Sequence, residues 1–515
     1  MIPITSKEKC LKIFMKISAV IYLVAGFAFV LLPEKILNAI NQLSQKLLPK
    51  LPLIPLSDGK FWLILAFSMM MTITALCCLA QRNVRKYNGY IVSLLVAKFT
   101  SSITGLCFFL CSDKYFAYLL IFIVDGALLG LTLFFFIRAK LDFFKEHTTY
   151  FRKKPVIPRE TEPTKVAVLK GDDKFQLLDQ VLEQAGFWEV LDRRFQASGK
   201  SRENFSVVIK PNFMFLHHKK DISSYTDPEL VEALIDKIAA KGYSNIAIVE
   251  AQSTYGNYYA NWEVVTVAKY IGYSTEKNYR IADLTEEMVP YDYGGRFGQH
   301  FVGLTWRDAD FRISFAKNKT HVFCNYTLTL KNIYGTLPMQ DKLKEYHTQR
   351  EYDWPTIESM KHFPVHFGLI DAIYSGDGQF GVMVDPKPNH TKTMIAGENL
   401  MAVDYVGAKK MGLNPEDPQV GRFLSLAWEA FGKPKEIIWI GDQSVYDPWQ
   451  NVSDIFIKSL DLIEEAYAFS DWWFSGLTAM DEYFTFKRKA LPIIILRKIL
   501  APLKRIFYKY DYLGS

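Results

Sequence analysis

Four long runs of apolar residues, separated by short polar segments, dominate the first part of the chain. They span residues 13–32, 61–80, 91–111 and 115–137. Each run is about long enough to cross a hydrocarbon core of ~30 Å as an α-helix. The first run follows several lysines but is long and lacks a small-residue cleavage pattern, unlike a signal peptide. The pattern therefore predicts four transmembrane helices, the first of them an uncleaved anchor.

Beyond residue 164 the apolar runs are shorter, and each ends abruptly in polar residues. Examples are VAVLKGDD from Val166, SVVIKPN from Ser206, NIAIVEAQS from Asn245 and EIIWIGDQ from Glu436. Continuous Val and Ile runs separated by helical stretches are typical of strands covered on both faces. One such helix begins at the capping box TDPE, from Thr226, and ends at Gly242. The pattern predicts an α/β soluble domain with a largely parallel sheet, preceded by a four-helix all-α transmembrane region.

These patterns divide the chain into five expected parts. They are a four-helix transmembrane region at 1–145, a proline-rich linker at 146–164, the α/β domain at 165–450, an aromatic-rich helical extension at 451–486 and a basic amphipathic membrane-surface tail at 487–515. The tail combines many Lys and Arg residues with isoleucine, leucine and aromatic residues. Nucleic acid is a rival partner for a basic run, but four membrane helices favour an anionic inner leaflet. We therefore expect the lipid bilayer, and no nucleic acid, as partner.

Composition and charge set the expected location. The chain has 515 residues, 50% of them hydrophobic and 22% charged, which is too apolar for a purely soluble protein. Basic residues such as Arg82, Arg85 and Arg138 follow the second and fourth runs, and the positive-inside rule assigns those ends to the cytoplasm. The loop at 33–60 also carries lysines, so the bias is not uniform. We expect a multi-pass protein of the inner (cytoplasmic) membrane with its C-terminal domain in the cytoplasm.

Two charges lie inside the apolar runs, Lys98 in the third and Asp125 in the fourth. Counted from the hairpin between these runs, their depths differ by roughly 4 to 5 Å, which is within side-chain reach. An ion pair that joins two helices is the favoured interpretation, and a functional pair in the membrane is the alternative.

The cysteines limit the cofactors of the C-terminal domain. Of six cysteines, only Cys324 lies after the apolar runs. One thiol does not build a zinc site or a cysteine-ligated iron–sulfur cluster, so neither is expected from this chain.

Polar residues follow the predicted strands at the edge where α/β sheets bind ligands. Lys210-Pro211-Asn212 and Glu250 each come directly after such a run. In open α/β sheets, ligands bind beyond the carboxyl ends of the strands. An ammonium and an amide at that place suit an anionic group such as phosphate or carboxylate. The alternative is that Lys210 simply reaches solvent.

The stretch VFCNYTLTLKNIYG repeats this chemistry. If VFCNYTLTL is a strand, Lys331 and Asn332 lie at its end, and Gly335 permits a tight turn. Lys342 and His347 are five residues apart, a spacing that does not stack them on one face of a regular helix. The pattern favours a recognition loop, with a solvated lysine and histidine as the alternative.

Two further segments supply carboxylates. GLIDAIYSGDGQFG contains Asp371 and Gly378 and formally matches G-x-G-x-x-G, but prolines follow instead of a helix, which excludes a Rossmann cofactor site. A backbone loop that approaches a ligand closely at Gly378 fits this segment better. GENLMAVDYVGAKKMG predicts a helix closed by Gly412, with Asp404 among apolar neighbours.

Two explanations of these residues stay open. In the first, a divalent metal (Mg or Mn) is held by Glu250, Asp371 and Asp404, while an anionic substrate binds elsewhere in the site. Candidate catalytic residues are then His347, Asp371 and Glu250, and the candidate substrate-binding residues are Lys210, Asn212, Lys331, Asn332 and Gly378. In the second, the lysines and carboxylates neutralise one another as a structural network.

The combination of IKPN, TDPELVEALIDKI, GYSNIAIVEA, LKNIYGTLP, IDAIYSGDGQFG and GENLMAVDYVGAKKMGL resembles an uncharacterised prokaryotic family, domain of unknown function 362 (DUF362). The resemblance covers about residues 166–447, and the membrane region is an addition to it. It implies that all nine candidate residues named above occupy family motif positions. Some relatives carry a ferredoxin-type module, but this chain lacks the cysteines for one.

Two classes of function follow. The first is a membrane-anchored enzyme of the cytoplasmic face that is metal-dependent and acts on an anionic small molecule, phosphorylated, carboxylated or lipid-linked. The second is a non-catalytic ligand-binding or electron-transfer accessory module with a membrane protein partner. No nucleophile elbow, P-loop or histidine zinc motif specifies a reaction.

Overall fold

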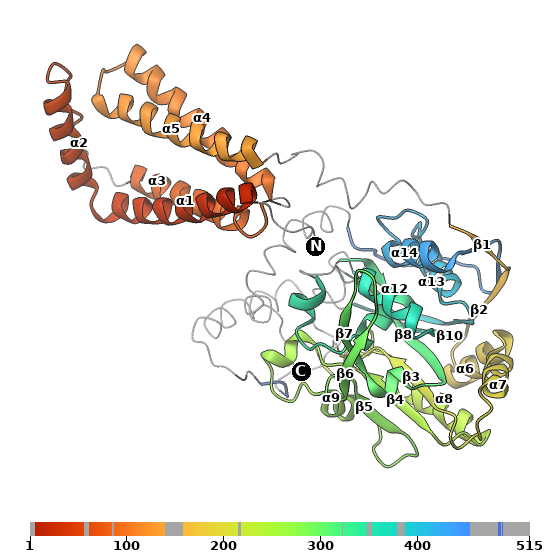
Figure 1. Ribbon diagram of the computed structural model, residues 1–515. Coiled ribbons are helices and arrows are strands. Elements are labelled where there is room, and N and C mark those ends of the chain that lie inside the picture. Colours follow the sequence, from red (N-terminus) through yellow and green to blue (C-terminus); the bar gives the residue numbers. More distant parts are fainter. Residues whose placement is uncertain are drawn as a thin grey trace. The chain divides into compact units, whose positions relative to one another are not determined.

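The computed structural model describes most of the chain and shows two compact units, Met1–Pro155 and Val156–Ser515. The described residues are 6–55, 61–84, 87–139, 158–214, 218–321, 323–347, 353–378, 387–453, 483–485 and 487 (Figure 1). The segments 454–482 and 488–515 lie outside them, so the predicted basic tail and most of the aromatic-rich extension stay predictions.

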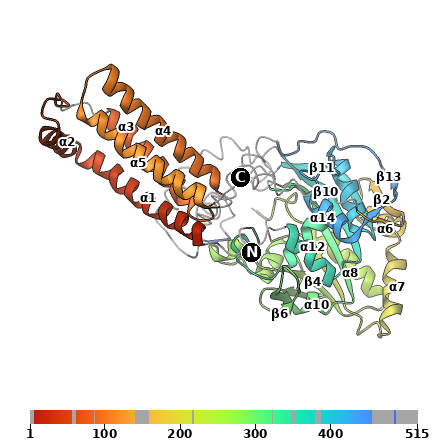
Figure 2. The same cartoon turned by 45° about the horizontal axis from the view of Figure 1, so that its top comes forward.

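The first unit is built on four long apolar helices that run side by side in both views (Figures 1 and 2). They are α1 (Ser6–Leu31), α3 (Phe61–Ala80), α4 (Asn88–Cys111) and α5 (Phe116–Ala139). All four are long and apolar enough to cross a membrane. Close packing of α4 against α5 depends on Gly105, because a Cβ there would lie 2.9 Å from the Tyr118 carbonyl oxygen. The prediction of four long apolar helices is confirmed.

A fifth helix, α2 (Pro33–Leu47), lies in the segment that the sequence patterns leave as a loop. Pro33 occupies its first turn, where the missing N–H costs nothing, and Glu34 follows. At 15 residues it is too short to cross a membrane. A search for membrane-spanning runs therefore passes over it, although its apolar residues recur at helical spacing.

The two charges inside the helices pair as predicted. Lys98 is 4% exposed, and its Nζ lies 2.9 Å from Oδ1 of Asp125. Ser101 donates a hydrogen bond to the second oxygen of the same carboxylate. The ammonium also lies 4.6 Å from the centre of the Tyr22 ring of α1. The pair and its neighbours thus join three of the four long helices inside the bundle.

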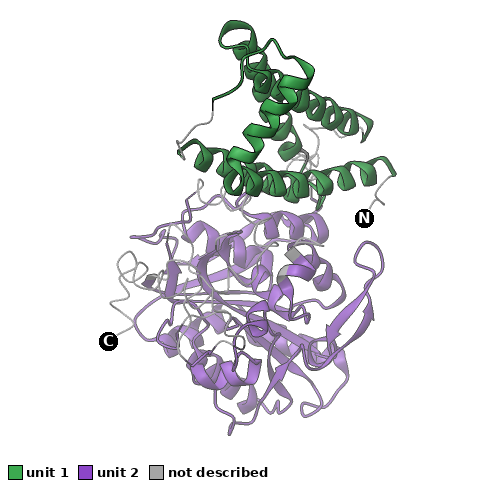
Figure 3. Cartoon of the chain, turned by 90° about the vertical axis from the view of Figure 1, so that its left-hand side faces the viewer, with its two compact units in different colours: residues 1–155 green, residues 156–515 purple. Residues whose placement is uncertain are grey.

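The second unit, coloured purple in Figure 3, is organised around a nine-stranded sheet. The strand order is β13-β2-β11-β10-β8-β3-β4-β5, with β9 paired to β8. Its strands are β2 (Thr164–Lys170), β3 (Val207–Pro211), β4 (Ile246–Glu250), β5 (Arg280–Asp283), β8 (Phe311–His321), β9 (Asn325–Thr327), β10 (Phe367–Asp377), β11 (Lys387–Gly397) and β13 (Ile437–Gly441). Only β9 and β11 pair antiparallel with their neighbours. The predicted α/β fold with a largely parallel sheet is confirmed.

Helices cover both faces of the sheet because alternate strand residues point to opposite sides. Val207 and Ile209 of β3 join one apolar cluster, and Val208 joins another. The first cluster includes residues of α6 (Lys174–Gln184), α7 (Phe187–Ser198), α8 (Pro228–Ala240) and α9 (Val264–Ile271). The opposite face is covered by α11 (Thr329–Ile333), α12 (Asp353–His362), α13 (Leu400–Lys410) and α14 (Arg422–Phe431). The helices predicted from TDPE and from GENLMAVDYVGAKKMG are confirmed as α8 and α13.

The second unit also contains smaller elements outside the main sheet. They are the hairpin β6 (Met288–Asp292) and β7 (Gln299–Gly303), the pair β1 (Glu160–Thr161) and β12 (Lys433–Pro434), the short helix α10 (Leu304–Arg307) and the 3₁₀ turns η1 (Thr254–Asn257) and η2 (Tyr334–Thr336). From the predicted aromatic extension, Phe484 is 2% exposed and packs against Trp262, with ring centres 4.6 Å apart. This contact attaches the described residues near 484 to the α/β unit.

Two local predictions are wrong. VFCNYTLTL does not form one strand, because β9 contains only Asn325–Thr327 and α11 begins at Thr329, so Lys331 and Asn332 lie on a short helix. The segment of Lys342 and His347, predicted as a recognition loop, is partly helical, because η3 (Leu343–His347) is a π-helix and Lys342 directly precedes it. In both places, tertiary contacts impose a helical turn that the residue spacing does not encode.

The buried ion pair in the membrane unit gives a testable expectation. Asp125→Ala leaves Lys98 buried without its carboxylate and should lower the free energy of unfolding by roughly 3 kcal/mol. The double substitution Lys98→Met with Asp125→Leu should recover most of that loss, since it removes both charges together. Unfolding of the detergent-solubilised protein checks both values, with Ser93→Ala on the exposed face of α4 as control. A double variant as unstable as Asp125→Ala would contradict the assignment.

Candidate functional site

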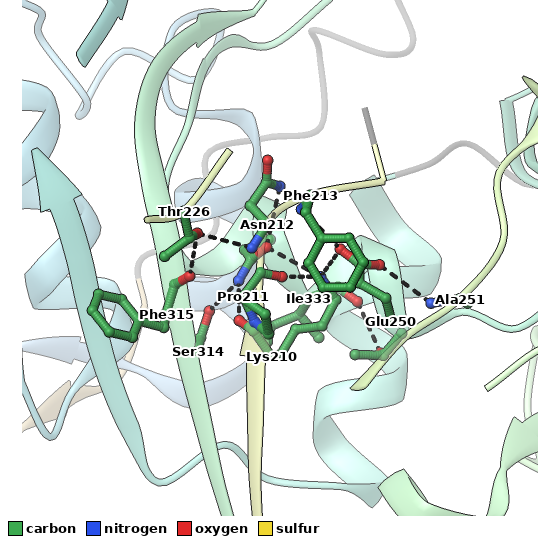
Figure 4. A network of polar contacts seen from close by, with 12 residues as sticks. Lys210, Pro211, Asn212, Phe213, Thr226, Glu250, Ala251, Ser314, Phe315 and Ile333 are labelled. Carbon is green, nitrogen blue, oxygen red and sulfur yellow. Dashed lines mark hydrogen bonds and ion pairs between the residues drawn. The ribbon is translucent and has the colours of Figure 1, made fainter. Parts of the chain in front are cut away.

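The carboxyl ends of two neighbouring parallel strands, β3 and β4, carry a buried ion pair. Lys210 is fully buried, and its Nζ lies 2.5 Å from Oε1 of Glu250 (Figure 4). The same ammonium donates to the carbonyl oxygen of Pro211 at 2.6 Å and to Oδ1 of Asn332 at 3.3 Å. Burial lowers the pKa of Lys210, and the Glu250 carboxylate opposes that shift. Lys210 therefore does not reach solvent, which excludes the simplest alternative for it.

Asn332 of α11 joins this pair to the middle of the sheet. Its amide nitrogen donates to the carbonyl oxygen of Lys210 at 2.7 Å and to Oγ of Ser314 at 3.2 Å. Its amide oxygen accepts from Nδ2 of Asn212 at 3.2 Å (Figure 4). The side-chain oxygen of Asn212 is buried and has no hydrogen-bond partner among the residues that the structure describes. The predicted residues Lys210, Asn212, Glu250 and Asn332 are thus brought together in one network.

Gly335 makes the network sterically possible. A Cβ at this position would lie 2.6 Å from Nζ of Lys210 and 2.8 Å from Oε2 of Glu250. Its carbonyl oxygen also accepts from the N–H of Ala251, the residue after β4, at 3.1 Å. The glycine is required for the close approach of the chain to the ion pair, rather than for a positive φ.

The Asp404 carboxylate caps the beginning of α11. Its Oδ1 accepts from the N–H of Thr329 at 2.7 Å, and Oδ2 accepts from the N–H of Leu330 at 3.2 Å. These are unpaired amides at the first turn of α11, so the carboxylate caps the helix that carries Lys331 and Asn332. Burial raises the pKa of Asp404 to about 7, although these hydrogen bonds oppose the shift. Asp404 is therefore a positioning residue.

Lys319 and Lys342 are buried lysines that lack a carboxylate partner among the described residues. They are 5% and 6% exposed. Within the described part of the chain, their ammonium groups donate only to backbone carbonyls, of Ser224 and Leu337 respectively. Lys342 also lies 5.4 Å from the centre of the Tyr334 ring.

Burial lowers the pKa of Lys319 and of Lys342 to about 7. Around Lys319, Asp221 and Glu250 oppose this shift, and Lys331 and Lys317 add to it. Around Lys342, Glu250 and Asp283 oppose it, and Lys210 and Lys331 add to it. The cationic groups of this edge of the sheet are therefore close enough to repel one another.

Lys331 belongs to the same group. Its Nζ lies 4.2 Å from the centre of the Tyr334 ring. Burial lowers the pKa of Lys331 to about 8, and the neighbouring Lys210 adds to the shift. The charge of Lys331 adds to the lowering of the pKa of both Lys319 and Lys342. We refer to Lys210, Lys319, Lys331 and Lys342 together as the lysine cluster.

Asp371 pairs with Lys317 in an adjoining part of the same sheet edge. The Lys317 Nζ lies 2.9 Å from Oδ2 of Asp371, which also accepts from the N–H of Asp227 at 2.9 Å. This pair contributes to the wall of a pocket of about 320 Å³. The wall also includes Lys174, Tyr225, Asp227, Glu229 and Tyr374.

The segment from Ser224 to Asp227 connects the two parts. Thr226 accepts from the N–H of Asn212 and donates to the carbonyl oxygen of Phe315, each at 2.9 Å. Ser224 on one side of it receives Lys319, and Asp227 on the other side donates to Asp371. The segment 224–227 thus links the pocket, which Tyr225 and Asp227 line, to the carbonyl oxygen that Lys319 contacts.

The structure does not assemble the predicted metal site. Glu250 is paired with Lys210, Asp371 with Lys317, and Asp404 caps α11. Among the described residues, no three His, Cys, Asp or Glu side chains are grouped to hold a metal ion. The carboxylates do not converge because each one neutralises or caps a different element, so these residues do not fit a three-carboxylate Mg or Mn centre.

The remaining candidates lie apart from the network or outside the described side chains. Gly378 follows β10 with φ at +146°, and its N–H donates to the carbonyl oxygen of Gln450 at 2.9 Å. The backbone of His347 ends η3, and its side chain is not among those that the structure describes. Its predicted catalytic role stays a prediction.

The sequence patterns do not single out Lys317 and Lys319. Both lie on β8, in FRISFAKNKTH, where lysines alternate with other residues. Alternation of this kind is typical of a strand with one face in water. In the sheet, however, β8 lies between β10 and β3, and both lysines are buried. The sequence signal for this part of the site was the pair of lysines two residues apart on one strand, Lys317 and Lys319.

Comparisons with known proteins bear on the family. No curated protein matches the chain. The lactate racemase apoprotein from Thermoanaerobacterium thermosaccharolyticum matches as a solved structure, with 12% identity, 53% of this chain and 58% of that chain covered, and a TM-score of 0.30. A TM-score this low carries no argument about the site. The sequence model of the family described as Domain of unknown function (DUF362) matches residues 207–409, which contain Lys210, Glu250 and Lys331. Residues 207–409 are therefore similar to the DUF362 family.

Proposed function

We propose that this protein is a membrane-anchored enzyme whose α/β domain binds an anionic small molecule at the lysine cluster and transfers a proton to or from it. The observation that carries the proposal is the burial of Lys319 and Lys342 with backbone carbonyls as their only hydrogen-bond acceptors among the described residues. The ligand class is a carboxylate or a phosphate, because both accept hydrogen bonds from several ammonium groups.

A structural role explains Lys210 and Lys317 but not these two lysines. Lys210 and Lys317 each face a carboxylate at ion-pair distance. A buried ammonium without such a partner destabilises the folded protein, because it loses its hydration without a compensating charge. Groups that lower stability in this way are concentrated at functional sites. An anion bound near Lys331 would supply the missing negative charge.

The shifted lysines also provide acid–base chemistry. A side chain whose pKa lies near neutral pH is present in both protonation states, which suits a general acid or base. The pKa values of Lys319 and Lys342, lowered by burial to about 7, meet that condition. We assign proton transfer to one of these two ammonium groups and charge stabilisation to Lys331. Lys210, held by Glu250 and Asn332, fixes the geometry around them.

The membrane region supports the proposed location. Four crossings would return the chain to the side of the bilayer on which it begins. Arg82 follows α3 and Arg138 lies in the last turn of α5, at the helix ends on that side, and the positive-inside rule assigns such ends to the cytoplasm. We therefore place the site at the inner face of a prokaryotic cytoplasmic membrane. A metal ion held by Glu250, Asp371 and Asp404 is not part of the proposal, because each carboxylate is engaged elsewhere.

The first test separates a functional lysine from a structural one. Lys342→Met and Lys319→Met each remove a buried unpaired charge, so each should raise the free energy of unfolding by about 1 kcal/mol or more. The same variants should weaken binding of inorganic phosphate or succinate at least tenfold, measured by calorimetry on the detergent-solubilised protein.

Two control variants accompany this test. Lys435→Met, at an exposed lysine, should change neither stability nor binding. Glu250→Gln should lower stability, because it leaves Lys210 buried without its carboxylate. Destabilisation of Lys342→Met to the extent of Glu250→Gln, or unaltered anion binding in both lysine variants, would contradict the proposal. Anion binding without turnover of any carboxylate or phosphate would leave the binding function and remove the enzymatic one.

The second test uses pH. The folded-state pKa values of Lys319 and Lys342 are lowered to about 7, whereas an unfolded lysine titrates near 10.4. Above pH 7 the unfolded state binds more protons, so stability should rise with pH, by on the order of 1 kcal/mol per lysine between pH 7 and 8.5. Chemical unfolding across this range checks the slope. The Lys319→Met and Lys342→Met double variant should have a smaller slope, and an unchanged one would show that other groups cause it.

A further inference from the structure

We infer that α2 and residues 48–55 lie flat in the headgroup region of the membrane leaflet at which α1 ends and α3 begins, with their apolar side chains against lipid acyl chains. This inference concerns the membrane unit and does not depend on the chemistry proposed for the lysine cluster.

The connections of the helices place α2 at one end of the bundle. It follows α1 directly and packs against α1 and α5 (Figure 1). With four antiparallel crossings, α1 ends, α3 begins, α4 ends and α5 begins at this side. The linker to the α/β domain leaves after Ala139, at the other end of α5. In a bilayer, α2 therefore lies at the surface opposite to the one at which α1 begins and α5 ends.

One face of α2 is apolar and incompletely covered. Ile36, Ile40, Leu43 and Leu47 recur three or four residues apart, and Ser44, beside them, is 1% exposed. Leu43 and Leu47 remain 40% and 60% exposed. The other face carries Asn38, Gln42, Gln45 and Lys46. A short helix with one apolar and one polar, basic face is typical of a helix at a membrane interface.

The chain after α2 is folded back onto it by a side chain. Asn41 donates through Nδ2 to the carbonyl oxygen of Ile54 at 2.9 Å, and its Oδ1 accepts from the N–H of Ile54 at 3.0 Å. This double hydrogen bond holds residues 48–55 beside the helix, where Leu48 and Leu53 are 40% and 42% exposed. Three prolines in this segment lack the N–H groups that a poorly hydrated interface would leave unsatisfied.

Lipid fits this surface better than a protein partner does. Apolar side chains at the same ends of the long helices are exposed as well, with Leu31, Phe61 and Leu110 at 70%, 65% and 63%. Exposed apolar side chains at the ends of membrane-spanning helices are what acyl chains cover. The segment also carries Lys35, Lys46 and Lys50 against one acid, Glu34, a charge balance that suits anionic headgroups.

Spin labels on the full-length chain in nanodiscs of mixed neutral and anionic lipid test the inference. In a cysteine-free background, Leu43→Cys and Leu47→Cys report the apolar face, and Gln42→Cys and Gln45→Cys are matched controls on the same helix. We expect labels at 43 and 47 to collide several-fold more often with oxygen than with a water-soluble nickel chelate, and labels at 42 and 45 to show the reverse. Asn41→Ala should raise the nickel accessibility of a label introduced as Leu53→Cys.

Each other outcome overturns the inference. Equal nickel accessibility at all four positions would place α2 in water. Labels at 43 and 47 shielded from both reagents would place a protein, such as a second copy of the chain, on this face. If the cysteine-free protein does not fold, photolabelling of the unaltered chain with diazirine lipids replaces the measurement. Absence of label from residues 36–53, with label on α3, would then count against the inference.

Discussion

The ion pair between Lys210 and Glu250 fixes the geometry of the α/β domain at the candidate site. It joins the carboxyl ends of two adjacent strands, and neither charge reaches solvent. A buried pair of this kind is tolerated only when every remaining donor and acceptor is also satisfied. Pro211, Asn332 and the N–H of Ala251 meet that requirement, and Gly335 leaves room for them. Residues far apart in the chain are thereby held at one edge of the sheet.

The buried lysines at this edge of the sheet differ in their partners. Lys210 and Lys317 are neutralised by carboxylates, whereas Lys319 and Lys342 bond only to carbonyl oxygens among the described residues. The first two lysines and their acids form a rigid frame. The other two keep lowered pKa values because of burial and because Lys331 repels both. In the proposed function, stability and acid–base chemistry are thus assigned to different lysines of the same sheet edge.

Asp404 shows how a buried carboxylate can position a helix of the candidate site. Its side chain caps α11, and α11 carries both Lys331 and Asn332. From the sequence alone, an acid in an apolar helix looks like a metal ligand or an ion-pair partner. Its side chain accepts hydrogen bonds from backbone N–H groups because the start of α11 lies against α13. No local sequence pattern predicts this contact.

The sequence by itself determined the architecture. Apolar runs of membrane-spanning length gave the four long helices, and Val and Ile runs ending in polar residues gave strands β2, β3, β4 and β13. These features follow from burial over a continuous stretch, so local composition is enough to find them. The pairing of Lys98 with Asp125 was accessible too, because a short hairpin fixes their relative depth.

In the α/β domain, only the tertiary structure decided which charged groups meet. It separated Glu250, Asp371 and Asp404, placed Lys331 on a helix instead of a strand end, and buried Lys319 in a central strand. The physical reason is that a charge is neutralised by side chains from distant segments, which must lie at hydrogen-bonding distance from it. Residue spacing constrains neighbours along one element, whereas the strand order of the sheet determines which elements become neighbours.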